Sequence, residues 1–140
     1  MQLILLAAGR GSRLPKKFRS KPKCLSIINK RTILEHNLKF YQKFDNRCIV
    51  TGYKSILLKK FAKKNNFKII HNKKFSSTNM VYSMLLTKKL INQDAVICYG
   101  DIIFNPSLYN LLQEKKNIMP LNINWLKIWK KRMTFKEIKK

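Results

Sequence analysis

Acidic side chains are scarce in this sequence, which has six Asp and Glu against 31 Lys and Arg and a formal net charge of +25. A positive field of this size attracts nucleic acids, anionic lipids and phosphorylated small molecules. The lysines are spread along the chain, however, and they accompany many Ile and Asn residues, as an AT-rich coding sequence would produce. Two explanations of the charge therefore remain: binding of an anionic ligand, and a compositional bias of the genome.

Glycine and proline are also few, with four of each in 140 residues, which excludes a collagen-like chain or a proline-rich spacer. With 45% apolar residues the chain can build a core, so a mainly disordered protein is excluded. No apolar run approaches the roughly 18–20 residues of a membrane span. The apolar start, residues 3–8, follows no basic stretch, so we expect no secretion signal.

Cysteine occurs three times, at Cys24, Cys48 and Cys98, with no CxxC spacing. An odd and scattered set excludes a disulfide framework and a structural zinc site, and it favours a reduced, cytoplasmic protein. We expect no nucleophilic role for Cys24, because no His lies near it in the sequence. The two histidines, His36 and His71, lack partners at metal-ligand spacing, so we expect them to serve packing or the surface.

Strand-like and helix-like segments alternate along the chain. Apolar strand segments cover residues 2–7, 47–51, 67–70 and 95–99. Helices are expected after Thr32, which forms a capping box with Glu35, and after Ser55, Asn79 and Asn105. This alternation predicts an α/β, Rossmann-like, doubly wound and mostly parallel sheet. We assign residues 1–133 to one nucleotide-binding α/β domain and residues 134–140 to a basic tail.

The apolar spacing also predicts which side chains face inward. In the helix after Asn79 these are Met80, Val81, Met84 and Leu85. Near the end of the chain, Trp125 and Trp129 are spaced i, i+4, a spacing more typical of a core than of a ligand platform.

The predicted topology brings two distant segments together. In a doubly wound sheet with the common strand order 3-2-1-4, ligands bind between the first and fourth strands, beyond their carboxyl ends. The segment Gly9–Arg13 leaves the first of these strands and Asp101 follows the fourth. We therefore expect both at one crevice.

The segment Gly9–Arg13 has the composition of a phosphate-binding loop. Gly9 and Gly11 permit unusual backbone angles and a close approach of the ligand, and exposed N–H groups can cradle phosphate. Arg13 and Lys23 add positive charge. The spacing matches neither GxGxxG nor the P-loop, so a plain turn with solvated charges is the alternative.

Asp101 stands out in so cationic a chain. A carboxylate directly after an apolar strand suits a magnesium ligand, and a turn or helix cap is the alternative. The acids Asp94 and Glu35 are better explained as caps.

Two stretches resemble a known family. The first is Leu6-Ala7-Ala8-Gly9-Arg10-Gly11-Ser12-Arg13-Leu14, followed by Lys21-Pro22-Lys23-Cys24-Leu25. It is similar to the LAAGxGxRL and PK motifs of the sugar-phosphate nucleotidyltransferase superfamily. Gly100-Asp101, Thr78–Met84 and Trp125–Trp129 with Arg132 resemble its phosphocholine cytidylyltransferase-like branch. The resemblance covers residues 2–133.

The resemblance implies roles for the matching positions. Leu6, Ala7, Ala8 and Gly9 would contact the base and ribose, and Thr78, Asn79 and Ser83 would border the base. Gly11, Ser12 and Arg13 would hold the β- and γ-phosphates. Lys23 would neutralise charge on the α-phosphate, and Asp101 would hold Mg²⁺.

The resemblance implies a reaction that joins a nucleoside monophosphate, expected to be CMP from CTP, to a phosphorylated acceptor and releases pyrophosphate. Phosphocholine, another amino-alcohol phosphate and a sugar phosphate all remain open, as precursors of cell-surface polysaccharide or lipid. Catalysis would rest on positioning and charge neutralisation by Arg13, Lys23 and Asp101.

The sequence departs from the family in its length and in its acids. Family members run well past 200 residues, so we expect a C-terminally truncated member that lacks the usual second acidic metal ligand. The stretch between Leu14 and Lys21 is also shorter than usual. Weak activity, dependence on a partner chain or a homo-oligomer, and a nucleotide-binding remnant without turnover are the resulting expectations. A basic nucleic-acid-binding protein is the remaining alternative, although no such motif is present.

Overall fold

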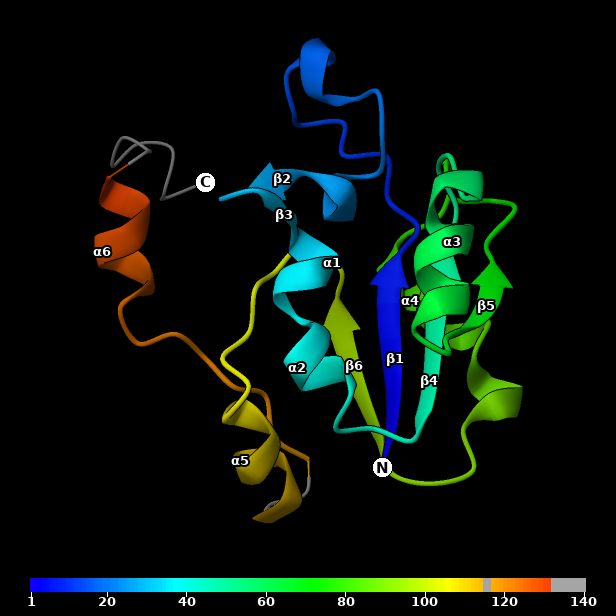
Figure 1. The fold of residues 1–140 in the computed structure, drawn as a ribbon, viewed down its shortest axis with the longest axis vertical. Coiled ribbons are helices and arrows are strands. Elements are labelled where there is room, and N and C mark those ends of the chain that lie inside the picture. Colours follow the sequence, from blue (N-terminus) through cyan, green and yellow to red (C-terminus); the bar gives the residue numbers. More distant parts are fainter. Residues whose placement is uncertain (115–116, 132–140) are drawn as a thin grey trace. The chain divides into compact units, whose positions relative to one another are not determined.

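A four-stranded parallel sheet organises the first part of the chain. A computed structural model describes residues 1–114 and 117–131. The strands are β1 (Gln2–Ala7), β4 (Asn46–Thr51), β5 (Lys68–His71) and β6 (Ala95–Tyr99), in the order β5-β4-β1-β6. Figure 1 shows all four running in the same direction. In chain order this is 3-2-1-4, so the predicted α/β class and the predicted strand order are confirmed.

Strand β1 forms the centre of the core because it is paired on both sides. Leu5 lies opposite Ile49 of β4 and Cys98 of β6, and all three side chains are buried. A strand covered on both faces reads as a continuous apolar run, which is what residues 2–7 show.

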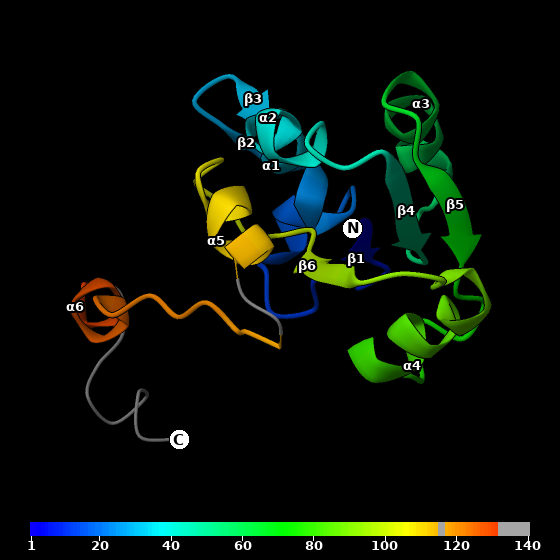
Figure 2. The same cartoon turned by 90° about the horizontal axis from the view of Figure 1, so that it is seen from below.

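Helices cover both faces of the sheet. Figure 2 shows α1 (Ile33–His36), α2 (Leu38–Tyr41) and α3 (Ile56–Lys64) on one face and α4 (Met80–Leu85) on the other. Three short 3₁₀ turns, η1 (Lys16–Phe18), η2 (Lys23–Leu25) and η3 (Lys88–Leu90), lie in the connections. A two-stranded hairpin of β2 (Ile27–Ile28) and β3 (Arg31–Thr32) precedes α1, and the sequence analysis did not predict this hairpin.

The helix predicted after Thr32 is divided in two at Asn37. The capping box is present, with the Glu35 backbone N–H donating to Thr32 Oγ1. Asn37 is fully buried, and its side-chain nitrogen donates to the carbonyls of Ile33 (3.1 Å) and Ile102 (2.7 Å). This side chain thus joins the first helix to the segment after β6, a contact that local periodicity cannot reveal.

Two further local predictions need correction. Ser55 precedes α3 but makes no capping hydrogen bond, because its own backbone is already helical (φ −52°, ψ −29°). In α4 the predicted inward face is wrong at three of its four positions, since Met80, Val81 and Leu85 are 52%, 46% and 56% exposed, whereas Met84 is partly buried.

The second compact unit comprises residues 110–140, and the first residues 1–109. Helix α5 (Leu108–Glu114) starts in the first, and α6 (Trp125–Lys130) lies in the second. The tryptophan pair makes an edge-to-face contact at 5.7 Å, but Trp125 is 49% exposed and Trp129 37%, so the expected core position is wrong. Arg132 and the predicted tail 134–140 lie outside the described residues, and the boundary at residue 133 stays a prediction.

The remaining expectations concern single side chains. His36 Nε2 lies 2.7 Å from the carbonyl of Ile28, and His71 Nδ1 lies 3.4 Å from Thr51 Oγ1, so both histidines make packing contacts. Asp94 accepts from the Gln2 N–H through its backbone carbonyl, at 2.8 Å. Among the described helices, none combines the length and the apolar character needed to cross a bilayer.

Candidate functional site

A cavity of about 560 Å³ opens at the carboxyl ends of β1 and β6. It lies in the first compact unit, where the loop after β1 meets the segment after β6 and the start of α4. Every site residue predicted from the sequence lines it: Leu6, Ala7, Ala8, Gly9, Gly11, Ser12, Arg13, Lys23, Thr78, Asn79, Ser83 and Asp101. The structure therefore brings the whole predicted set together, while the role of each residue stays a prediction.

The loop after β1 owes its shape to one glycine. Gly11 has a positive φ of 66°, which side chains rarely adopt, and the Leu14 N–H donates to its carbonyl at 2.9 Å. A Cβ at Gly11 would also lie 3.3 Å from Leu14 Cδ1. Gly9, by contrast, has no atom within 4 Å of an added Cβ, so its lack of a side chain leaves open space for a ligand.

Arg19 holds this loop in place, although the sequence marked it only as one of several basic residues. Its Nε donates to the carbonyl of Leu14 at 2.6 Å, and its Nη2 donates to the carbonyl of Ser12. The carbonyl of Arg19 in turn accepts from the Tyr53 hydroxyl at 2.8 Å. Because Arg19 binds two backbone carbonyls of this connection, we expect it to hold the loop in one conformation.

Replacing Arg19 with Gln tests this ordering. We expect the free energy of unfolding to change by less than about 1 kcal/mol, because the lost bonds lie near the surface. The affinity for CTP should fall about tenfold, because part of the binding free energy is then used to order the loop. CTP titration calorimetry and hydrogen exchange across residues 9–14 measure the two effects.

The matched control is Lys16→Gln, which removes one exposed positive charge from the same connection. Equal losses of affinity in the two variants would contradict the ordering role, because charge alone would then explain both.

A single ion pair closes one side of the cavity. Lys23 Nζ lies 2.6 Å from Asp101 Oδ2, across 78 residues of sequence, and the two side chains are 40% and 35% exposed. The segment that carries Asp101 packs closely on β1 at Gly100, because a Cβ there would lie 3.1 Å from the carbonyl of Leu6. The expected meeting of the glycine loop and Asp101 is therefore present in the structure.

The start of α4 borders the opposite side of the cavity. The Asn79 side chain caps the helix by accepting from the Tyr82 N–H at 3.1 Å. Asn72, which is 1% exposed, donates to Thr78 Oγ1 (3.0 Å) and Ser83 Oγ (3.1 Å). The two hydroxyls are thus already used by the fold, and the amide nitrogen of Asn79 is the group left for a ligand.

The donor set limits the kind of metal site. Within residues 1–114 and 117–131, no cluster of three or more His, Cys, Asp or Glu could hold an ion. One carboxylate, Asp101, lines the cavity together with cationic side chains. This set fits Mg²⁺, which is commonly held by one or two carboxylates together with substrate phosphates and waters.

Cys24 also lines the cavity, but its thiol is not poised for reaction. Its side chain is 4% exposed, and burial raises its pKa to about 12. Burial likewise raises the pKa of Cys98 to about 12 and that of Cys48 to about 11. All three groups are therefore neutral thiols at physiological pH, as expected for residues without a nucleophilic role.

Thiol titration tests this assignment. The native protein should react with Ellman's reagent at less than about one hundredth of the rate of free cysteine at pH 8, because neither thiolate nor access is available. All three thiols should react after unfolding in urea. Rapid reaction of one thiol in the native state would contradict its burial.

Several lining residues were given no site role from the sequence. Five of them lie in the motifs quoted for the resemblance: Arg10, Leu14, Cys24, Met80 and Gly100; the other three, Phe75, Ser76 and Tyr99, lie outside those motifs. Phe75 packs near Tyr53, with ring centroids 6.1 Å apart, and the Arg10 guanidinium lies 6.0 Å from the Tyr53 ring. No pattern marks Phe75, which follows two lysines, whereas Tyr99 could have been found as the last residue of a strand that ends at the crevice.

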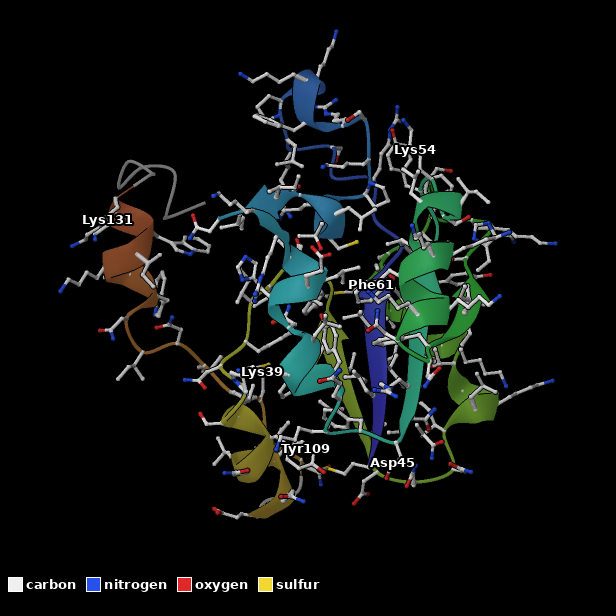
Figure 3. All side chains as sticks on the ribbon, in the orientation of Figure 1. Lys39, Asp45, Lys54, Phe61, Tyr109 and Lys131 are labelled. Atoms are coloured by element: carbon white, nitrogen blue, oxygen red, sulfur yellow. The ribbon has the colours of Figure 1, made fainter. Side chains whose placement is uncertain are left out.

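Positively charged side chains occur around the cavity and also on the rest of the chain. Figure 3 shows nitrogen-tipped side chains on many elements of the chain. Lys54 Nζ donates to the carbonyl of Ser20 at 2.8 Å. In the described part of the chain Arg13 has no carboxylate within ion-pair distance, so its guanidinium can serve a ligand.

Comparison with known proteins places these features in context. Residues 3–117 match the family model of the MobA-like NTP transferase domain. The chain is 30% identical over 145 residues to the CTP:phosphoglutamine cytidylyltransferase of Campylobacter jejuni, covering 94% of this chain and 56% of that protein. It is 33% identical over 111 residues to the choline-phosphate cytidylyltransferase of Haemophilus influenzae, covering 78% and 47%.

A solved structure agrees with these matches. The CTP:phosphocholine cytidylyltransferase of Streptococcus pneumoniae superposes with a TM-score of 0.66 at 25% identity, over 71% of this chain and 44% of that one. The chain thus spans about half the length of the relatives it matches.

Proposed function

Since the chain belongs to the family of MobA-like NTP transferase domains, we propose that it binds CTP with Mg²⁺ and transfers CMP to a phosphorylated small molecule. One observation carries the proposal. The glycine loop, Lys23 and Asp101 line a single cavity at the ends of β1 and β6, although they are far apart in the sequence. This is where a doubly wound sheet binds nucleotides.

The loop after β1 would hold the β- and γ-phosphates. Gly11 and Ser12 offer backbone N–H groups, and the Arg13 guanidinium can bind two phosphate oxygens at once. Lys23 would bind the α-phosphate, on which negative charge develops during transfer. Asp101 would hold Mg²⁺, which supplies charge neutralisation when bound.

The reaction then needs no covalent nucleophile from the protein. An oxygen of the acceptor phosphate attacks the α-phosphorus in line, the new P–O bond forms, and the bond to pyrophosphate breaks. The protein's contribution is to align acceptor and nucleotide and to stabilise the charge of the transition state. The buried, neutral Cys24 takes no part.

The names of the relatives support cytosine as the base and a phosphorylated acceptor. Relatives from C. jejuni and H. influenzae are a phosphoglutamine and a choline-phosphate cytidylyltransferase. For this chain the amide nitrogen of Asn79 is the polar group best placed to contact the base, since its oxygen caps α4. The acceptor is proposed as a phosphomonoester, with its second functional group left open.

A second candidate is nucleotide binding without turnover. The single carboxylate that lines the cavity favours it. In this case the chain would bind CTP and Mg²⁺ but release no pyrophosphate.

A coupled assay distinguishes these functions. The protein is incubated with Mg²⁺, each of the four common nucleoside triphosphates and a panel of phosphorylated acceptors that includes phosphocholine. Pyrophosphate release above background with CTP supports transfer. CTP binding without release supports the second candidate, and failure of all four nucleotides to bind contradicts both.

A salt titration addresses nucleic-acid binding, the remaining function that the charge suggests. Affinity for nucleic acid should fall steeply between about 50 and 200 mM salt because counterions are released. The affinity of a Mg²⁺-dependent site for CTP should fall much less over that range. If the affinity for CTP falls as steeply with salt as the affinity for nucleic acid, nucleic-acid binding is favoured.

A further inference from the structure

The loop after β1 has little regular structure of its own. Between β1 and η2, its one regular element in the described chain is the 3₁₀ turn η1. Among the described residues, the backbone of residues 9–14 bonds to itself once, from the Leu14 N–H to the Gly11 carbonyl at 2.9 Å. A loop with so few internal hydrogen bonds keeps one conformation only where other parts of the chain hold it.

Tyr53, which lies two residues after the end of β4, contacts this loop at three points. Its N–H donates to the carbonyl of Ala8 at 3.0 Å, where the loop begins. The centre of its ring lies 6.0 Å from the Arg10 guanidinium. Its hydroxyl donates to the carbonyl of Arg19 at 2.8 Å, near the end of the connection. Tyr53 therefore holds both ends of the loop.

The bond to Arg19 reaches the phosphate-binding segment through the Arg19 side chain. The guanidinium donates to the carbonyls of Ser12 and Leu14, the residues on either side of Arg13. The Tyr53 hydroxyl thus fixes the backbone of the residue whose side chain fixes the neighbours of Arg13. Because Arg13 lines the cavity, a shift of Arg19 would move a group that is free to bind phosphate.

The contacts of the neighbouring residues support the same end of the loop. Lys54 Nζ donates to the carbonyl of Ser20 at 2.8 Å, directly after Arg19. This bond does not involve the Tyr53 hydroxyl, so we expect the connection to stay attached when that hydroxyl is removed. The role of Tyr53 can therefore be tested without detaching the loop.

We propose that Tyr53 is a positioning residue for the phosphates of the nucleotide. Through Arg19, its hydroxyl holds the loop after β1 in the conformation in which Arg13 can bind them. Tyr53 itself does not line the cavity, so it acts on a ligand through the loop and not by contact. The identity of the ligand rests on the proposed function, whereas the ordering of the loop needs no nucleotide.

Tyr53→Phe removes the hydroxyl and leaves the ring and the backbone bond to Ala8. In the ligand-free protein, we expect the amides of residues 9–14 to exchange hydrogen about fivefold faster, because a bond that orders the loop is lost. The affinity for CTP with Mg²⁺ should also fall about fivefold, since binding must then order the loop. Hydrogen-exchange mass spectrometry and titration calorimetry measure the two effects.

A double-mutant cycle with Arg19→Gln tests whether the effect passes through the Arg19 side chain. Independent losses of about fivefold and about tenfold would multiply to about fiftyfold in the double variant. We expect a loss of only about tenfold, because without the guanidinium the position of the Arg19 backbone no longer affects Ser12 and Leu14. If Tyr53 served general stability alone, its substitution would lower the affinity alike in both backgrounds.

Tyr109→Phe is the matched control, because it removes a tyrosine hydroxyl elsewhere. Tyr109 is half-buried like Tyr53, packs against Phe44 with ring centroids 5.1 Å apart and does not line the cavity. We expect the exchange of residues 9–14 to be unchanged and the affinity for CTP to change by less than about twofold. Thermal unfolding of every variant shows that each is folded.

Unchanged exchange of residues 9–14 in Tyr53→Phe would overturn the proposal. So would a loss of about fiftyfold in the double variant, or equal losses in Tyr53→Phe and Tyr109→Phe. If the unsubstituted chain binds CTP and Tyr53→Phe binds it equally well, the inference about Tyr53 fails and the proposed function stands. If the unsubstituted chain binds no CTP, the proposed function fails and the role of Tyr53 toward its phosphates fails with it.

Discussion

Asp101→Asn should remove the Mg²⁺-dependent part of CTP binding. The substitution keeps the shape of the side chain but removes the carboxylate charge that lines the cavity. We expect CTP affinity in the presence of Mg²⁺ to fall about 100-fold, or about 2.7 kcal/mol. Affinity without Mg²⁺ should stay the same or rise, because Lys23 loses the partner that lies 2.6 Å away and becomes free for phosphate.

Calorimetric CTP titrations with Mg²⁺ and with EDTA measure both effects. Asp94→Asn is the matched control, since Asp94 directly precedes β6 at the opposite end of the strand and contacts Gln2 through its backbone. We expect no change in this control. Equal losses in the two variants would refute a specific role of Asp101 with the metal.

Gly52→Ala should cause the largest loss of stability among single substitutions near the site. An added Cβ would lie 2.5 Å from Phe75 Cβ and 2.7 Å from the carbonyl oxygen of Ala8. Neither contact can be relieved by a flexible side-chain end, so the backbone after β4 or the Phe75 segment must shift. We expect the free energy of unfolding to fall by about 3 kcal/mol and CTP affinity to fall with it.

Urea unfolding followed by far-UV circular dichroism measures this loss. Gly9→Ala is the matched control, because the same methyl group meets no atom within 4 Å there. Its stability should change by less than about 0.5 kcal/mol. A similar loss in both variants would show that backbone flexibility, rather than the close contact at Phe75, accounts for the effect.

The sequence was sufficient for the architecture because the signals were local and strong. The apolar runs mark strands β1, β4, β5 and β6, and the common topology then places Gly11 and Asp101 at one crevice. The match to residues 3–117 also confirms the resemblance to sugar-phosphate nucleotidyltransferases that the loop motif suggested. The roles of the individual site residues stay predictions.

The features that could not be predicted from the sequence are contacts between segments that are distant in the sequence. Asn37, where α1 ends, donates to the carbonyl of Ile102, and Asn72, which follows β5, donates to Thr78 and Ser83. In the sequence Arg19 is one of 31 Lys and Arg residues. Only the structure shows that its guanidinium donates to the backbone carbonyls of Ser12 and Leu14.

The inward face predicted for α4 failed for a different reason. Periodicity indicates that a helix face is suited to burial, but it does not identify what buries it. Met80, Val81 and Leu85 have the predicted pattern, yet among the described residues they stay about half exposed.

Lys23 and Asp101 neutralise each other's charge at the cavity, with Nζ and Oδ2 2.6 Å apart. On the proposed function, a triphosphate would compete with Asp101 for Lys23, and Mg²⁺ would compete with Lys23 for Asp101. Either ligand alone would leave one of these two charges unpaired, whereas both together would pair each of them. The proposed function therefore implies that CTP and Mg²⁺ bind cooperatively.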